Sequence, residues 1–213
     1  AEGAAGGDPS PWTALGVFEA MQAAARQSLG AELSDLTVAV QGTGNVGAAL
    51  CRRLADAGAR LVIADIDPRR RNTLAAVLNA NVVDVADIAA VEADIFAPCA
   101  LGGALDPQSV VAMQARLVCG AANNQLATPD VAELLRTRGI VYVPDYVANA
   151  GGIISVSAEY LGEDRASVAA RVDQIGGRVA QILDQAKREE RSPALVADEM
   201  AEAIIGEAER QAA

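Results

Sequence analysis

The feature that most constrains this chain is a Gly-x-Gly-x-x-Gly pattern formed by Gly42, Gly44 and Gly47. Apolar runs at 36–40 and 61–65 predict two strands, and the Ala/Leu-rich stretch between them predicts a helix. Gly42 allows a tight turn out of the first strand, Gly44 allows backbone to approach a ligand, and Gly47 allows the helix to pack against the sheet. The pattern therefore predicts a strand, a turn, a helix and a second strand around a binding turn.

A turn of this kind binds phosphate, because the first N–H groups of the helix, here at Asn45 and Val46, have no partner within it and the helix dipole favours an anion. Asp65 closes the second predicted strand about 20 residues after Gly44, the spacing of a carboxylate that accepts hydrogen bonds from a ribose. Together these residues predict a dinucleotide site. Two plainer readings stay open: a tight turn in an ordinary α/β domain, and Asp65 as a cap for a helix beginning at Pro68.

Composition restricts the partners of this chain. Its 213 residues are 52% apolar, and 28 acidic against 17 basic residues give a net charge of −11. This balance argues against nucleic acid and anionic membranes, and no apolar stretch approaches the ~20 residues that span a bilayer. No N-terminal signal is visible, so we expect a cytoplasmic protein whose partners are small molecules and other subunits.

The chain has no histidine, and its single lysine, Lys187, lies in a charged cluster typical of a solvated helix face. Cys51, Cys99 and Cys119 are odd in number and match no metal-ligand spacing, so we expect neither disulfides nor a bound metal. A dehydrogenase moves a proton as well as a hydride, yet no residue stands out as the base. Since the chain begins without methionine, we expect it to be part of a longer protein.

Alternating elements predict the fold. Ser10 and Pro11 predict the N-cap and first residue of a helix that runs to about Gly30. Further apolar runs bring the predicted strands to six, with helices between most of them: strands at 81–83, 94–96, 116–119 and 140–143, and helices near 68–79, 106–114 and 128–138. This order predicts an α/β fold with a doubly wound, mostly parallel Rossmann sheet.

From Asn149 onward the pattern is helical, with a segment to Leu161, a long helix over 165–190 and a last helix after Pro193. We expect three parts: a linker at 1–10, an NAD-binding Rossmann domain at 11–162 that includes its leading helix, and C-terminal helices at 163–213.

Three loops that follow predicted strands are rich in small residues and asparagine: 97–103, 120–125 and 144–152. In doubly wound folds the ligand lies at these strand ends. Asparagine both donates and accepts hydrogen bonds without charge, as a nicotinamide carboxamide requires. Asparagine and glycine are also common in any turn, but three such loops at one edge favour a site.

Five segments resemble the leucine, phenylalanine and valine dehydrogenases, over nearly the whole chain: Asp8-Pro9-Ser10-Pro11-Trp12-Thr13-Ala14, Val40-Gln41-Gly42-Thr43-Gly44-Asn45-Val46-Gly47, Phe96-Ala97-Pro98-Cys99-Ala100-Leu101-Gly102-Gly103, Ala122-Asn123-Asn124-Gln125-Leu126 and Pro144-Asp145-Tyr146-Val147-Ala148-Asn149-Ala150-Gly151-Gly152. Glutamate dehydrogenases belong to the same superfamily, but these forms are similar to the branch that acts on apolar amino acids.

The resemblance implies reversible oxidative deamination of an apolar L-amino acid to its 2-keto acid and ammonia, with NAD as cofactor, in a homo-oligomer. In this family an N-terminal substrate domain carries two lysines and an aspartate that bind and convert the substrate. That domain is absent from this sequence, so the resemblance implies no catalytic residue in this chain and no activity of the chain alone.

The resemblance also implies roles for single residues. Asp65 and Ile66 hold the adenosine, with Ile66 on the adenine, while Asn149 reaches both substrate and nicotinamide. Four residues lie at the nicotinamide end: Thr13, Ala100, Ala122 and Asn123. Val179 and Ile182 correspond to apolar residues of the substrate pocket, although core packing explains this stripe of the long helix equally well.

The choice of cofactor and the class of protein have alternatives. A carboxylate at Asp65 favours NAD because it repels the 2′-phosphate of NADP, whereas the arginines at 69–71 could accept that phosphate. The function also has alternatives to an amino acid dehydrogenase. One is a catalytically inactive module that binds NAD to sense it. Another is a 2-hydroxy-acid dehydrogenase, and the lack of histidine argues against it.

Overall fold

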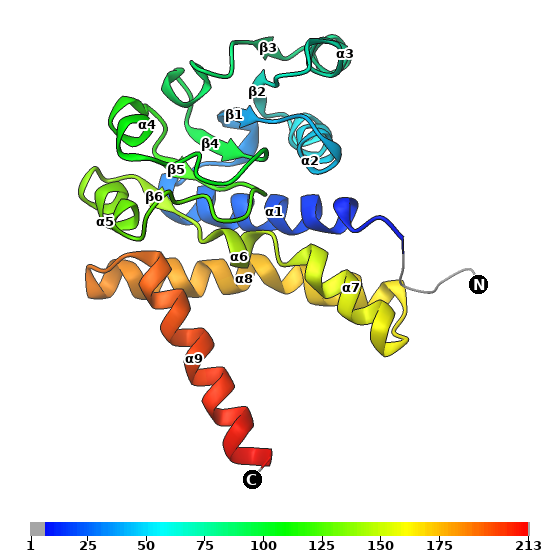
Figure 1. Cartoon of the computed structure of the whole chain (residues 1–213), viewed down its shortest axis with the longest axis vertical. Helices are drawn as coiled ribbons and strands as arrows, with labels where there is room; N and C mark the ends of the chain where they lie inside the picture. Colours follow the sequence, from blue (N-terminus) through cyan, green and yellow to red (C-terminus); the bar gives the residue numbers. More distant parts are fainter. Residues whose placement is uncertain (1–6, 213) are drawn as a thin grey trace.

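Six parallel strands form one sheet in the order β3-β2-β1-β4-β5-β6 in the computed structural model, which describes residues 7–212 (Figure 1). The strands are β1 (Thr37–Gln41), β2 (Arg60–Ala64), β3 (Asn81–Val82), β4 (Ile95–Pro98), β5 (Leu117–Val118) and β6 (Val141–Tyr142). In register, Val40 of β1 lies beside Ile63 on one side and Ala97 on the other. The chain changes direction across the sheet between β1 and β4, which confirms the predicted doubly wound topology.

Helices cover both faces of the sheet. In chain order the helices are α1 (Ser10–Ala24), α2 (Asn45–Asp56), α3 (Pro68–Leu78), α4 (Pro107–Ala112), α5 (Asp130–Thr137), α6 (Asp145–Ala148), α7 (Gly151–Leu161), α8 (Arg165–Glu189) and α9 (Pro193–Ala212). Because successive strand residues point to opposite faces, Val38 and Val40 pack with α1, α2 and α8, while Ala39 packs with α4 and α5. Aspartate side chains cap three of these helices: Asp67 for α3, Asp106 for α4 and Asp164 for α8.

The start of α1 differs from the prediction. The helix begins at Ser10, with Pro9 at the N-cap and no side-chain cap, so the assignment of Ser10 as N-cap is wrong. The carboxylate of Asp8 accepts the Ser10 N–H at 2.9 Å, which lets the chain turn one residue earlier. A π-helical turn and a left-handed Gly30 end the helical region where we expected it. Of the predicted linker at 1–10, residues 1–6 lie outside the described part of the chain.

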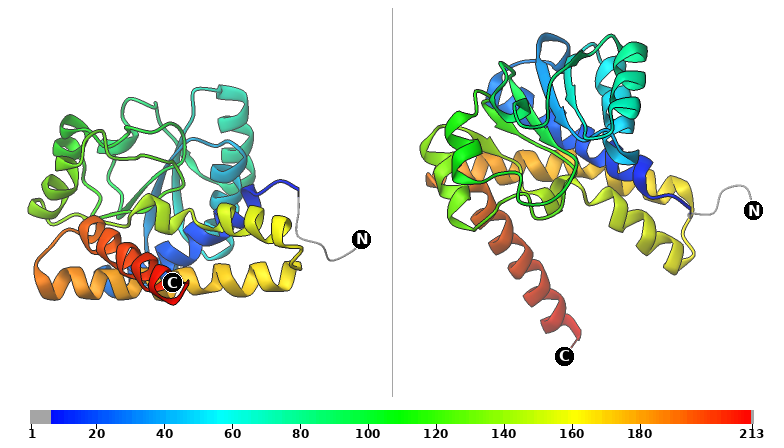
Figure 2. Two further views of the ribbon diagram at one scale, coloured as in Figure 1. Left: turned by 60° about the horizontal axis from the view of Figure 1, so that its bottom comes forward. Right: turned by 45° about the horizontal axis from the view of Figure 1, so that its top comes forward.

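The helix α1 packs between the sheet and the C-terminal helices α7 and α8 (Figures 1 and 2). A Cβ on Gly151 would lie 2.1 Å from the Trp12 carbonyl oxygen, and one on Gly16 would lie 2.8 Å from Cδ1 of Ile175. Backbones therefore approach closely here because glycine occupies both positions. The last helix, α9, extends away from the sheet, and across residues 7–212 no helix has the length and hydropathy to span a bilayer.

We expect Gly151→Ala to lower the free energy of unfolding by about 3 kcal/mol, because the added methyl group overlaps the Trp12 carbonyl. Gly177→Ala is the control, since its Cβ would meet no atom within 4 Å on the exposed side of α8. That change should stabilise the protein by up to about 1 kcal/mol. Urea denaturation of both variants measures the difference, and equal midpoints would contradict the close packing of α1 on α7.

Candidate functional site

Two of the three glycines in the turn after β1 are required by the fold itself. Gly42 has a φ of +97°, and a Cβ there would lie 2.8 Å from the Cβ of Ala100. A Cβ on Gly47 would lie 2.0 Å from the Gly42 carbonyl oxygen. Side chains at these positions would push the turn away from the loop after β4 and α2 away from β1.

Gly44 is different, because its φ of −66° is not in the left-handed region that favours glycine. Among the described residues, a Cβ on Gly44 would have one neighbour within 4 Å, Nη1 of Arg70 at 3.6 Å. The fold therefore leaves space over Gly44, which is the N-cap of α2. In the described part of the chain no side chain caps this helix, so the N–H groups of its first turn remain available to an anion.

Asp65 at the end of β2 connects this strand to the glycine turn. Its Oδ2 accepts hydrogen bonds from the Thr43 N–H at 2.6 Å and the Thr43 hydroxyl at 2.9 Å, and its Oδ1 accepts the Asp67 N–H at 2.8 Å. The side chain is only 7% exposed, and Asp67, not Asp65, caps α3. The reading of Asp65 as a helix cap is therefore wrong.

The charge state of Asp65 follows from these contacts. Burial alone would raise the pKa of its carboxyl group, but the hydrogen bonds from Asp67 and Thr43, together with the nearby guanidinium of Arg70, outweigh it and hold the pKa below its ordinary value. The ionised carboxylate therefore holds the turn. Sequence reasoning missed Thr43, whose signal is a hydroxyl residue between two glycines with an acidic residue at the next strand end.

The remaining adenosine-side residue, Ile66, follows Asp65 directly. Its side chain is 90% exposed, so a large apolar surface stands open beside the glycine turn. A planar apolar ligand group could cover this surface.

The predicted nicotinamide-side residues come together from different loops. Nδ2 of Asn149, after α6, donates to Oδ1 of Asn123 at 2.7 Å and to the carbonyl of Ala121 at 3.3 Å. Ala122 is buried, while Ala100 lies against the glycine turn through its contact with Gly42. The loops after β4, β5 and β6 thus meet at the edge where β1 ends.

Thr13 reaches the same region from the first turn of α1. Its hydroxyl donates to the Pro9 carbonyl at 3.2 Å, and a Cβ on Gly152 would lie 2.6 Å from the Thr13 oxygen. Thr13 therefore lies against Gly152 in the first turn of α7, and Gly152 is three residues after Asn149.

A buried pair behind the loop after β5 escaped sequence reasoning. Gln125 is fully buried, and its Nε2 donates to the carbonyls of Gly120 and Ala122 at 3.0 Å each. Its backbone N–H donates to Oδ2 of Asp145 at 3.2 Å. Because Gln125 holds the carbonyls of Gly120 and Ala122, on both sides of Ala121, it supports the shape of the loop that carries Asn123. The signal was the run Asn-Asn-Gln, in which only the asparagines were considered.

Val179 and Ile182 belong to the core, and Ile182 also borders a surface cavity with Val147 and Ala150, on either side of Asn149. Both side chains are almost completely buried in α8, within the core shared with α1. Their contact with a substrate stays a prediction. The cysteines offer no thiolate, since burial raises the pKa of all three thiols, that of Cys99 to about 11. Among the described residues no three acidic or cysteine side chains form a metal-binding group.

Comparisons with known proteins extend this description. The model of the Glutamate/Leucine/Phenylalanine/Valine dehydrogenase family matches residues 8–69 and 62–207. The chain is 42% identical over 200 residues to leucine dehydrogenase of Geobacillus stearothermophilus, covering 93% of this chain and 54% of that protein. It is 42% identical over 214 residues to valine dehydrogenase of Streptomyces coelicolor, and this match covers 97% of this chain and 58% of that protein.

A solved structure agrees with these matches. The crystal structure of L-tryptophan dehydrogenase from Nostoc punctiforme superimposes with a TM-score of 0.92 at 38% identity, covering 96% of this chain and 63% of that one. The chain spans about half the length of the curated relatives it matches.

We expect Thr43→Val to lower the free energy of unfolding by about 1 kcal/mol, because Asp65 loses the hydroxyl hydrogen bond while the shape of the side chain is kept. Thr73→Val is the matched control, on an exposed position of α3. Chemical denaturation of both variants tests this. A loss no greater for Thr43→Val than for Thr73→Val would show that the hydroxyl does not hold the carboxylate.

The lowered pKa of Asp65 predicts a pH dependence. Its ionised form stabilises the fold above the ordinary aspartate pKa of about 3.9, and this contribution disappears as the pH falls through the folded-state pKa. We therefore expect Asp65→Asn to be less stable than the unmodified chain at pH 7, with a difference that shrinks below about pH 4. Asp87→Asn, on an exposed aspartate, should show no comparable trend. A constant difference for Asp65→Asn would exclude this role of its charge.

Proposed function

Because the chain belongs to the glutamate, leucine, phenylalanine and valine dehydrogenase family, we propose that it forms the cofactor-binding part of an NAD-dependent L-amino acid dehydrogenase. The observation that carries the proposal is the glycine turn. Gly42 and Gly47 are demanded by close packing, whereas Gly44 borders open space at an uncapped helix N-terminus. A glycine that the fold does not need is explained by a ligand that approaches the backbone there.

We propose NAD as the cofactor of this chain. In our proposal the N–H groups at 45–47 bind its diphosphate, and Ile66 packs on its adenine. Asp65 accepts from the adenosine ribose through the one acceptor position that remains on its Oδ1, since an ionised carboxylate has about four and Thr43 and Asp67 use three of them. The same negative charge disfavours a 2′-phosphate, which supports NAD over NADP.

At the other end, the pair Asn123 and Asn149 and the hydroxyl of Thr13 would position the nicotinamide. Ala100 and Ala122 are small enough to let the ring lie against the backbone. NAD accepts a hydride when it is bound, and the loops supply position and a region of low charge around it. No ionised side chain is among these five residues, so the closing of the site would bury no unpaired ion at them.

We propose that the substrate is an apolar L-amino acid, which is oxidatively deaminated to its 2-keto acid and ammonia.

The domain limits of 11–162 for the Rossmann part and 163–213 for the last helices belong to the same proposal. Lys187 cannot serve as the base at these loops, because it lies at the other end of the strands. It lines a surface cavity with Gly139 and Val141, where β6 begins. We infer that a substrate domain outside these 213 residues supplies the catalytic lysine and aspartate, and that the complete protein is a cytoplasmic homo-oligomer.

The decisive experiment is a titration of the chain and of Gly44→Ala with NAD. The substitution should lower the free energy of unfolding by about 1 kcal/mol at most, because alanine is a poorer N-cap than glycine but its methyl group finds free space there. Binding of NAD should weaken at least tenfold, because the methyl group occupies the space of the diphosphate. Gly177→Ala is the control, with unchanged binding. Absence of NAD binding by the unmodified chain would overturn the proposal.

A second measurement concerns turnover. We expect the isolated chain with NAD and leucine, phenylalanine or valine to form no NADH, as followed by absorbance. The five residues that we assign to the nicotinamide end include no acid or base, and we place the catalytic lysine and aspartate in a substrate domain outside these 213 residues. Sustained NADH formation would show that this chain carries the base and that our division of the catalytic residues is wrong.

A further inference from the structure

A cationic side chain stands at the open side of the glycine turn. Arg70 lies in the first turn of α3, and its Nη1 is 3.6 Å from the place that a Cβ on Gly44 would take. The guanidinium therefore reaches from the helix after β2 to the turn after β1. It borders the space into which a ligand at the N-terminus of α2 would extend.

The polar contact that Arg70 makes is weak. Its Nη2 lies 3.5 Å from Oδ2 of Asp67, at the limit of a hydrogen bond, and the Arg70 side chain is 52% exposed. Asp67 already accepts the N–H groups of Arg69 and Arg70 as the cap of α3. The guanidinium of Arg70 can thus turn to a ligand without breaking a strong ion pair.

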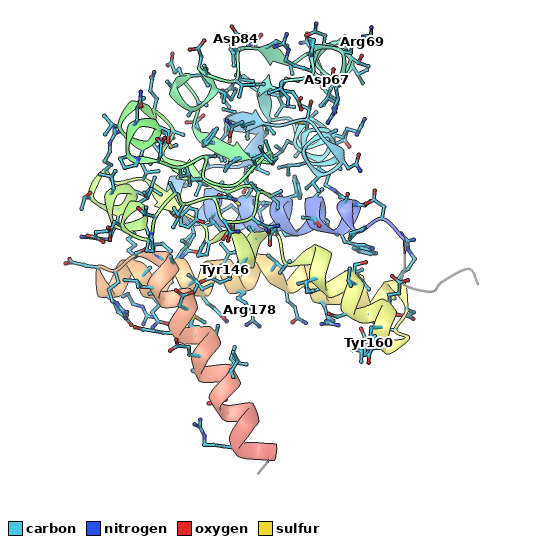
Figure 3. All side chains as sticks on the ribbon, in the orientation of Figure 1. Asp67, Arg69, Asp84, Tyr146, Tyr160 and Arg178 are labelled. Carbon is cyan, nitrogen blue, oxygen red and sulfur yellow. The ribbon has the colours of Figure 1, made fainter. Side chains whose placement is uncertain are left out.

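Neither neighbouring arginine is placed at Gly44. Arg71 lies 3.9 Å from Asp84, and its Nε donates to Asn72. Arg69 makes no side-chain hydrogen bond or ion pair within residues 7–212, and it stands near Asp67 at the start of α3 (Figure 3). Of the three, Arg70 is the one whose guanidinium lies at Gly44.

Electrostatics explains why a cation matters at this place. The chain has a net charge of −11, and two carboxylates, Asp65 and Asp67, lie beside the turn. A ligand with two phosphate charges would meet repulsion from both. The positive charge of Arg70 acts in the same region, since it is one of the causes that lower the pKa of Asp65.

We propose that Arg70 binds the diphosphate of the dinucleotide and forms charge-assisted hydrogen bonds to it beside the backbone N–H groups of α2. A guanidinium offers donors in a planar fork that matches two phosphate oxygens, which an ammonium does not. This inference rests on the proposed function and adds to it a residue that determines affinity. The glycine turn binds phosphate through backbone alone, and Arg70 adds a side chain from the next helix.

The position of Arg70 favours the diphosphate over a 2′-phosphate on the ribose. The middle glycine of such a turn is where backbone approaches the pyrophosphate, and Arg70 stands beside that glycine. A 2′-phosphate would lie at the carboxylate of Asp65, which is ionised and repels it.

The test compares Arg70→Ala with Arg69→Ala by calorimetric titration of NAD, NADP, ADP and adenosine. We expect Arg70→Ala to weaken NAD and ADP about tenfold, as loss of a charge-assisted contact would, while adenosine binds as before. Arg69→Ala removes the same positive charge at a neighbouring position, and its dissociation constants for all four ligands should stay within about twofold of those of the unmodified chain. The NAD affinity of Arg70→Lys should lie between those of the unmodified chain and Arg70→Ala, because lysine keeps the positive charge but lacks the planar guanidinium donors. Rising salt should reduce the difference between the unmodified chain and Arg70→Ala.

Other outcomes contradict the inference in distinguishable ways. Equal NAD affinity of Arg70→Ala and the unmodified chain would remove Arg70 from the site and leave the proposed function intact. A loss confined to NADP would place Arg70 at a 2′-phosphate instead. If the unmodified chain binds neither NAD nor ADP, the proposed function itself is wrong. Thermal unfolding of each variant in the absence of ligand verifies that the exposed substitution leaves the fold unchanged.

Discussion

The carboxylate of Asp65 is the constraint on which the site depends. It is buried at the end of β2 and accepts the N–H and hydroxyl groups of Thr43, so the turn after β1 is held by the neighbouring strand. With the turn held, α2 starts at Asn45 after its N-cap Gly44, at the end of the sheet that also carries the loops after β4, β5 and β6. A single ionised group thus positions the backbone donors and presents a negative charge where a ribose would bind.

Architecture and ligand binding make separate demands on the three glycines. Gly42 and Gly47 allow close packing, whereas Gly44 keeps space free for something outside the chain. This difference cannot be read from the Gly-x-Gly-x-x-Gly pattern, in which all three look alike. It appears only when the surroundings of each missing side chain are known.

Much of the fold follows from local sequence, because strand and helix periods, glycines and prolines act over short distances. The six strands, the helices between them and the edge that carries the loops were predicted in this way. Hydrogen-bond partners that lie far apart in the sequence were not predicted. The contacts of Thr43 with Asp65 and of Gln125 with Asp145 join residues 22 and 20 positions apart, for which local patterns give no signal. Val179 and Ile182 were ambiguous because a buried stripe has the same period in a core and in a pocket.

The placement of α1 has a consequence for the order in which the molecule can assemble during synthesis. This helix is made before the sheet, yet its outer surface is covered by α7 and α8, which are made after it. Thr13 and Gly152, which are 139 positions apart in the sequence, meet only when α7 has been made. A nascent chain halted before α7 would thus leave the apolar surface of α1 uncovered and prone to aggregation until the late helices are made.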